Sequence, residues 1–124
     1  MKIHESAENY LETILVLQQR KGSVRSIDIA NELEFSKPSV SVAMKNLRQG
    51  GYIEMDAAGQ IRLLPPGQAI AEAVLEKHRL MTEFLISLGV SAEVAAEDAC
   101  RIEHVLSDES FEAIRNHAQE LSGK

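Results

Sequence analysis

The chain has 124 residues, of which 44% are hydrophobic and only 4% aromatic, and its formal net charge at neutral pH is −6. This length fits one domain or two small units that share a core, and the hydrophobic content excludes a globally disordered chain. With no Trp, the core must consist mainly of Leu, Ile, Val, Ala and Met. Such a core favours packed helices over a β-sandwich.

Cysteine usage and hydropathy indicate the compartment. A single Cys excludes an internal disulfide framework and fits a reducing cytoplasm. The N-terminus lacks the apolar run of a signal peptide, and the longest apolar stretches are far too short to cross a bilayer. We therefore expect a cytoplasmic protein without a membrane partner.

The negative charge is concentrated in the second half of the chain. Residues 67–124 hold 5 Lys/Arg and 11 Asp/Glu, whereas residues 1–66 hold 8 of each. Residues 20–64 alone hold 7 basic and 5 acidic side chains. A DNA-facing unit joined to an acidic unit is compatible with this distribution.

Three helices are predicted first. Residues 5–19 carry a helical apolar stripe, and residues 26–33 form a short second helix with Ser26 as its N-cap. After a tight turn, a third helix is predicted over residues 37–49, where Ser36 can cap the exposed amides. A proline suits its first turn, and a glycine pair ends it.

A β-hairpin follows the three helices. Two short β-runs, residues 52–55 and 61–64, flank a segment that contains the Gly a hairpin turn needs. Helix, short helix, turn, helix and hairpin is the layout of a winged helix-turn-helix. The fold class is therefore mostly α with a small β-hairpin, and the predicted DNA-binding domain covers residues 1–66.

Three further helices make up the predicted second domain, residues 67–124. A Pro-Pro-Gly sequence at residues 65–67 breaks the chain and starts a long helix that reaches about residue 88. Ser91 caps a helix that reaches about residue 106, and a Ser-Asp pair caps a last helix. The chain shows no repeat and no long flexible linker.

The helix over residues 37–49 has the outer face of a DNA-reading helix. Its outer positions carry short polar and basic groups and no acidic one; they are Lys37, Ser39, Ser41, Val42, Lys45, Asn46 and Arg48. Short groups let a helix enter the major groove, and basic groups reach phosphates and base edges. Arg25 and Arg62 can contact the DNA backbone. The alternative is a winged helix that binds protein.

A candidate metal site lies on the helix that follows Ser91. Cys100, Glu103 and His104 share one helical face, and a thiol, a carboxylate and an imidazole can bind a transition metal. Taken alone, the cluster also fits a small buried thiol beside a solvated Glu-His pair. Ligand-type side chains on helices that could face the cluster favour metal; they are Glu8, Asn9, Glu12 and His78.

Four segments carry a resemblance to a known family; they are residues 8–11, 36–41, 77–80 and 98–109. On these residues the chain resembles the diphtheria-toxin repressor family of metal-activated repressors, which includes the manganese transport regulators. The resemblance covers nearly the whole chain. It implies a homodimer that binds double-stranded operator DNA and a second domain that binds metal and dimerises. It also implies Fe(II) or Mn(II) as corepressor and control of metal homeostasis genes.

The resemblance implies site residues as well. Cys100, Glu103 and His104 match metal ligands of the iron-responsive branch, His78 matches a ligand position of both branches, and Glu12 matches a carboxylate ligand of the manganese branch. Asn9 completes the candidate metal set. The DNA-facing start of the reading helix is matched by Ser36, Pro38, Ser39 and Ser41. The full predicted DNA-binding set is Arg25, Ser36, Lys37, Pro38, Ser39, Ser41, Lys45 and Arg62.

Three departures from the family pattern bear on the metal sites. Asn9 falls where the iron branch has a thioether and the manganese branch a carboxylate, and an Asn carbonyl is a neutral, weaker ligand. Thr82 and Ala96 fall where the iron branch places ligands of a second site, which puts that site in doubt. The chain is also expected to lack the SH3-like C-terminal domain of longer members.

Ligand chemistry leaves two candidates for the metal. A thiolate favours Fe(II), Co(II) or Zn(II), whereas carboxylates suit Mn(II). Cys100 therefore favours iron and Glu12 favours manganese. We expect Fe(II), with Mn(II) as the alternative and Zn(II) or Co(II) as substitutes in vitro.

Two other functions are alternatives to a metal-dependent repressor. A metalloenzyme needs an open coordination position, and the sequence offers no separate nucleophile–base pair and no Gly-rich phosphate loop. We therefore expect no enzyme and no small organic substrate. The remaining alternative is a metal-independent winged-helix DNA-binding regulator that uses Cys100 as a redox sensor.

Overall fold

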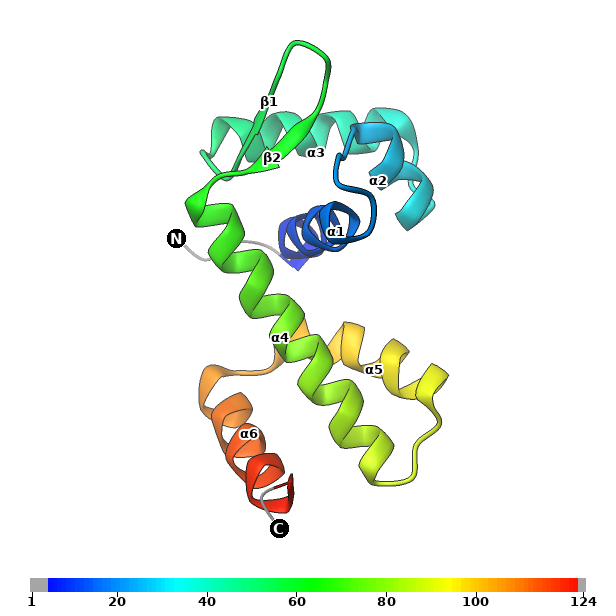
Figure 1. The fold of residues 1–124 in the computed structure, drawn as a ribbon, viewed down its shortest axis with the longest axis vertical. Coiled ribbons are helices and arrows are strands. Elements are labelled where there is room, and N and C mark those ends of the chain that lie inside the picture. The colour runs from blue at the N-terminus through cyan, green and yellow to red at the C-terminus, as the bar shows by residue number, and fades with distance from the viewer. Residues whose placement is uncertain (1–4, 123–124) are drawn as a thin grey trace. The chain divides into compact units, whose positions relative to one another are not determined.

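The computed structural model describes residues 5–122, which form six helices and a two-stranded hairpin (Figure 1). The elements are α1 (Glu5–Lys21), α2 (Ser26–Leu33), α3 (Lys37–Gln49), β1 (Ile53–Met55), β2 (Ile61–Leu63), α4 (Pro65–Ser87), α5 (Ala92–Val105) and α6 (Asp108–Ser122). The predicted fold class, mostly helical with a small β-hairpin, is confirmed. Among the described residues, no helix is long and apolar enough to span a membrane.

The chain divides into two compact units between Ala73 and Val74. This division falls inside α4, a helix of 23 residues. The domain boundary expected from the sequence, after residue 66, lies at the start of the same helix. Each unit is described separately below.

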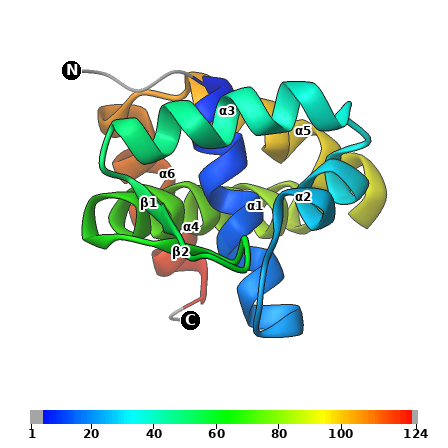
Figure 2. The same ribbon diagram turned by 90° about the horizontal axis from the view of Figure 1, so that it is seen from above.

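The first unit is a winged helix-turn-helix. Helix α1 packs against α2, α3 and β2, and α3 packs against α2 and β1 (Figures 1 and 2). Its interior is aliphatic, with Leu11, Ile14, Ile29, Val40 and Ile53 almost fully buried. These positions come from three helices and one strand, so the apolar stripe of each element meets in one core.

The start of α2 differs from the sequence prediction. The N-cap is Arg25, one residue before the predicted Ser26. The cap is completed by Asp28, whose carboxylate accepts a hydrogen bond of 2.9 Å from the Arg25 backbone N–H. Lys21 donates to the other oxygen of the same carboxylate. These bonds, with the Lys21 ammonium bond the largest influence, lower the pKa of Asp28 from its usual value.

The start of α3 follows the prediction. Ser36 is the N-cap, its hydroxyl accepts a hydrogen bond from the backbone N–H of Ser39, and a proline occupies the first turn. Val40, Met44 and Leu47 are buried at helical spacing, which fixes the inner face of α3. The opposite face is left exposed.

The wing is a short antiparallel hairpin in which Glu54 pairs with Arg62. At its tip, one carboxylate oxygen of Asp56 accepts hydrogen bonds from two backbone N–H groups, each at 2.9 Å. Gly59 has a φ of +82°, a backbone conformation that favours glycine. The predicted turn is therefore held by an aspartate and a glycine.

A close approach joins the base of the wing to the first turn of α4. The Tyr52 carbonyl oxygen accepts a hydrogen bond of 2.9 Å from the backbone N–H of Leu64. A Cβ added to Gly67 would overlap that same oxygen. Glycine at position 67 is therefore required by space, because the obstacle is main chain rather than a movable side chain.

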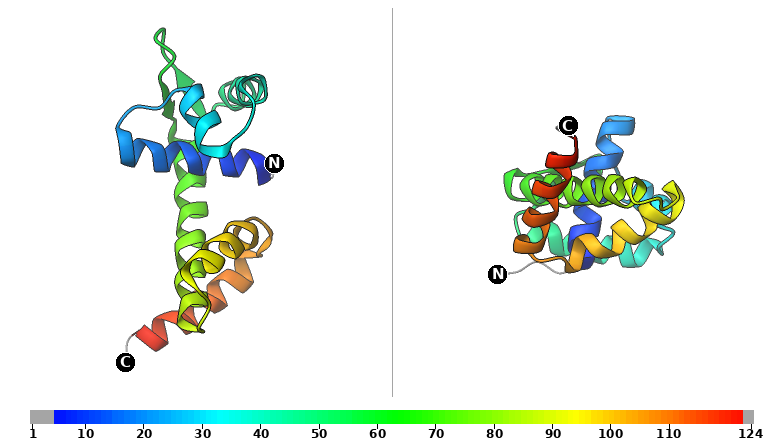
Figure 3. Two further views of the ribbon diagram at one scale, coloured as in Figure 1. Left: turned by 90° about the vertical axis from the view of Figure 1, so that its right-hand side faces the viewer. Right: turned by 90° about the horizontal axis from the view of Figure 1, so that it is seen from below.

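In the second unit, α5 and α6 both lie alongside the C-terminal half of α4 (Figures 1 and 3). Arg115 of α6 pairs with Glu76 of α4 and lies 4.6 Å from the ring centre of Phe111. The Phe84 ring meets the His117 ring edge-on, at 6.2 Å between ring centres. These contacts hold α6 on α4, while α5 is held by the polar pair described next.

Candidate metal centre and nucleic-acid interface

A buried carboxylate lies at the centre of the second unit. Glu103 of α5 is 2% exposed, and its Oε2 lies 2.9 Å from Nδ1 of His78 on α4. Helix spacing explains the burial, since Ala95, Ala99 and Glu103 recur every four residues and all three are buried. The sequence thus places an acidic group where the periodic pattern calls for an apolar one.

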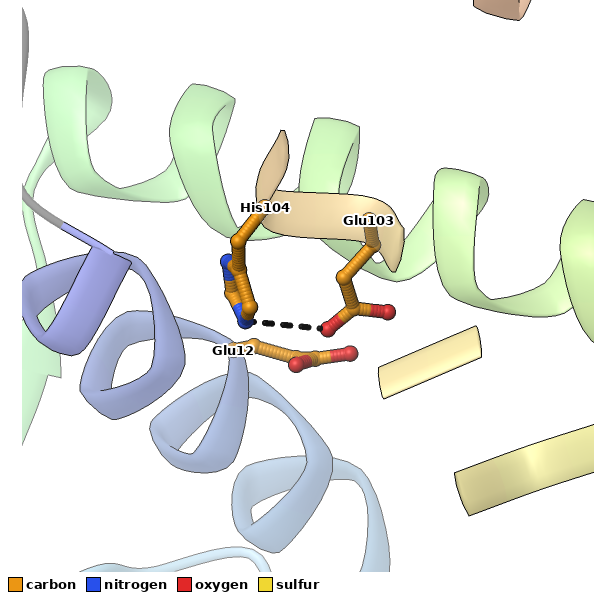
Figure 4. Close-up of side chains that lie close together, drawn as sticks. All are labelled: Glu12, Glu103 and His104. Carbon is orange, nitrogen blue, oxygen red and sulfur yellow. Dashed lines mark ion pairs between the residues drawn. The ribbon is translucent and has the colours of Figure 1, made fainter. Parts of the chain in front are cut away.

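The second oxygen of this carboxylate lacks a hydrogen bond. Glu103 Oε1 is buried, and no donor satisfies it among the described residues. His104 Nε2 lies 3.4 Å away, close enough for an ion pair but without hydrogen-bond geometry (Figure 4). A buried acceptor left unsatisfied typically costs about 1–3 kcal/mol. A bound cation is the kind of group that would remove this cost, so the residues present fit a metal ion.

The cysteine that shares this helix is placed differently. Cys100 lies three residues before Glu103 and is exposed, whereas the side chains of Glu103 and His104 are buried. Within the second unit, the structure therefore brings Glu103 together with His78 and His104. It leaves Cys100 at the surface one turn earlier.

The two α1 candidates belong to the first unit. Glu12 is 8% exposed, an unusual environment for a carboxylate on a helix whose neighbouring residues are apolar. Asn9 is half-buried, and its backbone carbonyl accepts a hydrogen bond of 2.8 Å from the Thr13 hydroxyl. Figure 4 draws Glu12 as the third side chain of ligand type. Both residues thus carry oxygen donors of the type that Fe(II) and Mn(II) accept.

The two positions that depart from the iron branch offer no strong ligand. The Thr82 hydroxyl donates to the backbone carbonyl of His78, at 2.7 Å, within the same helix. Ala96 has no donor atom in its side chain. The Thr82 hydroxyl is therefore engaged by the main chain of its own helix.

The predicted DNA-facing side chains are all at the surface. Exposed positions include every member of the set; they are Arg25, Ser36, Lys37, Pro38, Ser39, Ser41, Lys45 and Arg62. Arg62 lies 2.7 Å from the Glu54 carboxylate across the wing, so part of its charge is neutralised locally. The outer face of α3 contains no acidic residue, which suits a polyanion.

A small hollow on this face adds two residues that sequence reasoning missed. It is lined by Ser26 and Ile27 of α2 and by Lys37 and Ser41 of α3. Ser26 and Ile27 lie in the first turn of α2, where backbone N–H groups lack helical partners. A helix start beside a basic reading helix was the signal that could have identified them.

An exposed, acid-free reading helix in a winged helix-turn-helix, followed by a helical unit in which two histidines meet a buried glutamate, defines a DNA-binding regulator of the metal-responsive class. The comparisons with known proteins agree. The family described as "Iron dependent repressor, N-terminal DNA binding domain" matches residues 2–59. The one described as "Iron dependent repressor, metal binding and dimerisation domain" matches residues 65–122.

Individual relatives extend the match. The transcriptional regulator MntR of Escherichia coli O157:H7 is 35% identical over 120 residues, 97% of this chain and 77% of that protein. The diphtheria toxin repressor of Corynebacterium diphtheriae is 33% identical over 106 residues, 85% of this chain and 47% of that protein. The solved structure of the manganese regulator SloR has a TM-score of 0.81 at 29% identity, covering 96% of this chain and 55% of that one. The chain thus spans about half the length of the last two.

The chain belongs to the iron-dependent repressor family. The predicted resemblance and the predicted class, a metal-dependent transcriptional repressor, are confirmed at this level. Nothing in the comparisons supports the alternative of a metal-independent regulator with Cys100 as redox sensor. The relatives named above are regulators of transcription rather than enzymes.

Proposed function

We propose that this protein is a repressor that binds double-stranded operator DNA as a homodimer when a divalent metal ion, Fe(II) or Mn(II), is bound. The observation that supports metal binding is the buried Glu103 carboxylate. One of its oxygens lies beside the imidazole of His78, and the other has no hydrogen bond. The exposed, acid-free face of α3 favours the binding of DNA. Cytoplasmic location and control of metal homeostasis genes are part of the same proposal.

The proposed ligands are carried by three helices. Glu103, His104 and His78 supply two oxygens and two imidazoles from α4 and α5, and Cys100 supplies a thiolate from α5. Glu12 and Asn9 supply oxygens from α1. When bound, the ion compensates the negative charge of these buried carboxylates. A thiolate must lose its proton to ligate, so affinity is expected to fall as the pH falls.

The identity of the metal depends on Cys100. If the thiolate is a ligand, Fe(II) is favoured over Mn(II) because sulfur is the softer donor. If the site uses only the oxygen and imidazole donors, Mn(II) is the better fit. The Cys100→Ala variant separates these cases: loss of Fe(II) affinity with Mn(II) affinity retained supports the thiolate, and unchanged Fe(II) affinity opposes it.

A homodimer is supported by apolar groups on the surface of the second unit. Leu88 and Val105 are 66% and 76% exposed, and Ile86 and Val94 are also exposed. Large exposed apolar groups on a small unit suit a partner subunit. A dimer whose reading helices lie about one DNA turn, roughly 34 Å, apart can enter successive major grooves.

Metal and DNA are linked through the conformation that both prefer. If the metal-bound form favours the DNA-competent arrangement, coupling of this kind is typically about 1–3 kcal/mol. By reciprocity, operator DNA should tighten metal binding by the same factor. The coupling can therefore be measured as the effect of metal on DNA affinity or as the effect of DNA on metal affinity.

The test is a titration of DNA binding under reducing conditions. A duplex selected from a random pool would be titrated with protein plus Fe(II), Mn(II) or a chelator, with fluorescence anisotropy as the readout. We expect binding with either metal, and loss of binding with the chelator or in Glu103→Gln. Glu97→Gln, an exposed position on the same helix, is the matched control. Equal binding with metal and with chelator would refute the proposal.

A further inference from the structure

The reading helix exposes one large apolar side chain. Val42 is 61% exposed, and among the described residues it is the single large hydrophobic group of α3 that is exposed. The buried positions of the same helix are Val40, Met44 and Leu47. Val42 therefore contributes nothing to the inner face on which the fold depends.

Its position is the middle of the outer face. Ser39 lies three residues before Val42, and Lys45 and Asn46 lie three and four residues after it, so all four share one side of the helix. The three neighbours are exposed and polar. Val42 is thus an isolated apolar group within a polar, basic surface.

Single exposed apolar residues are ordinary on protein surfaces, and exposure alone identifies no site. The chemistry of the surroundings is more informative here. Valine cannot bond a phosphate, and the side chains around it already supply hydrogen-bond donors for phosphates and base edges. In the major groove, the apolar feature that a base pair presents is the C5-methyl group of thymine.

We propose that Val42 reads a thymine methyl group in each half-site and so determines part of the operator sequence. This inference rests on the proposed function, because it requires α3 to enter the major groove. It adds the chemical identity of one contacted base. It also assigns a specificity role to a side chain outside the predicted DNA-binding set.

The test removes the methyl group from either side of the contact. A duplex would be selected with the metal-loaded wild-type protein, and each thymine would then be replaced in turn by deoxyuridine, which lacks only that methyl. Burial of one methyl group corresponds to about a fourfold change in affinity. We expect one thymine per half-site at which the replacement weakens wild-type binding about fourfold.

Variants of the protein complete the cycle. Val42→Ala should bind the selected duplex more weakly and become insensitive to deoxyuridine at that position. Val42→Thr keeps the branched shape but replaces one methyl by a hydroxyl. Its affinity for the selected duplex should lie between those of the wild type and Val42→Ala. Glu97→Gln, at an exposed position of the second unit, is the control and should leave the scan of thymines unchanged.

The outcomes separate the two proposals. Selection of no duplex at all would overturn the proposed function and this inference with it. A selected duplex that Val42→Ala binds as tightly as the wild type, with the same response to deoxyuridine, would overturn this inference alone. Metal-dependent binding would then stand without a thymine contact at Val42.

Discussion

Replacement of Glu103 by Gln tests the metal centre most directly, because it removes a charge while keeping the size of the side chain. Glu103 is 2% exposed and has one buried oxygen without a hydrogen bond. If this carboxylate exists to bind a cation, the substitution should harm the metal-bound protein far more than the metal-free protein. We therefore expect the substitution to lower the free energy of unfolding of the metal-bound protein but not that of the metal-free protein.

The magnitudes follow from the surroundings of the carboxylate. In the metal-free protein, Gln removes a buried negative charge but leaves a polar amide in the same place, and it weakens the bond to His78 by about 1 kcal/mol. Metal at about 100 times its Kd stabilises the wild type by about 2.7 kcal/mol. If affinity falls about 100-fold, the same metal concentration stabilises the variant by about 0.4 kcal/mol.

The assay is urea unfolding with and without Mn(II), followed by circular dichroism. We expect metal-free Glu103→Gln to be at least as stable as the metal-free wild type, and to gain almost nothing from metal. Glu97→Gln makes the same charge change at an exposed position of α5 and should keep the full gain. The reasoning is refuted if Glu103→Gln destabilises the metal-free protein by more than about 1 kcal/mol and retains the metal-dependent gain.

Three further predictions address the first unit. Lys37→Glu with Lys45→Glu should abolish duplex binding and lower the salt dependence of any residual binding, with an unchanged circular dichroism spectrum; retained affinity would contradict the DNA-reading role of α3. Asp28→Asn should cost about 0.5–1 kcal/mol near neutral pH. Folding lowers the pKa of the Asp28 carboxyl below its usual value of 3.8. The stability that Asp28 contributes is therefore present at pH values above 3.8 and is lost as the pH falls through the lowered pKa. The stabilities of the wild type and of Asp28→Asn should therefore converge in acid unfolding curves. Gly67→Ala should destabilise the protein by about 1–3 kcal/mol despite the better helix propensity of Ala, because its Cβ meets the Tyr52 carbonyl; a gain in melting temperature would show that the main chain can yield.

The sequence predicted the elements because their signals are local. Apolar spacing identified the helices, Ser36 and the proline of the first turn identified the start of α3, and a Gly between two β-runs identified the hairpin. The sequence predicts Ser26 as the N-cap of α2, but the N-cap is Arg25, whose backbone N–H donates to the Asp28 carboxylate one turn later.

The sequence does not indicate which of the candidate metal ligands are buried. Helix periodicity placed Cys100, Glu103 and His104 on one face, but it does not say which member of a face is buried. The structure buries Glu103 and leaves Cys100 exposed, and burial of Glu103 depends on what packs against α5. The pairing of His78 with Glu103 joins residues 25 apart, and no local pattern predicts such a contact. The helical spacing places Val42 on the outer face of α3, but only the structure shows how exposed this apolar side chain is.

Position 67 at the start of α4 and the tip of the wing have opposite consequences for protein engineering. At position 67 the obstacle is a peptide carbonyl, so no compensating side-chain change elsewhere can open that position to mutagenesis libraries. The tip is permissive, because Ala57 and Ala58 are exposed and their conformation is held by Asp56 rather than by their own side chains. Since the one native thiol belongs to the proposed metal site, a fluorophore is best introduced at Ala57 in a Cys100→Ala background loaded with Mn(II), the ion that the remaining oxygen and imidazole donors suit. There it would report the contact of the wing with a duplex.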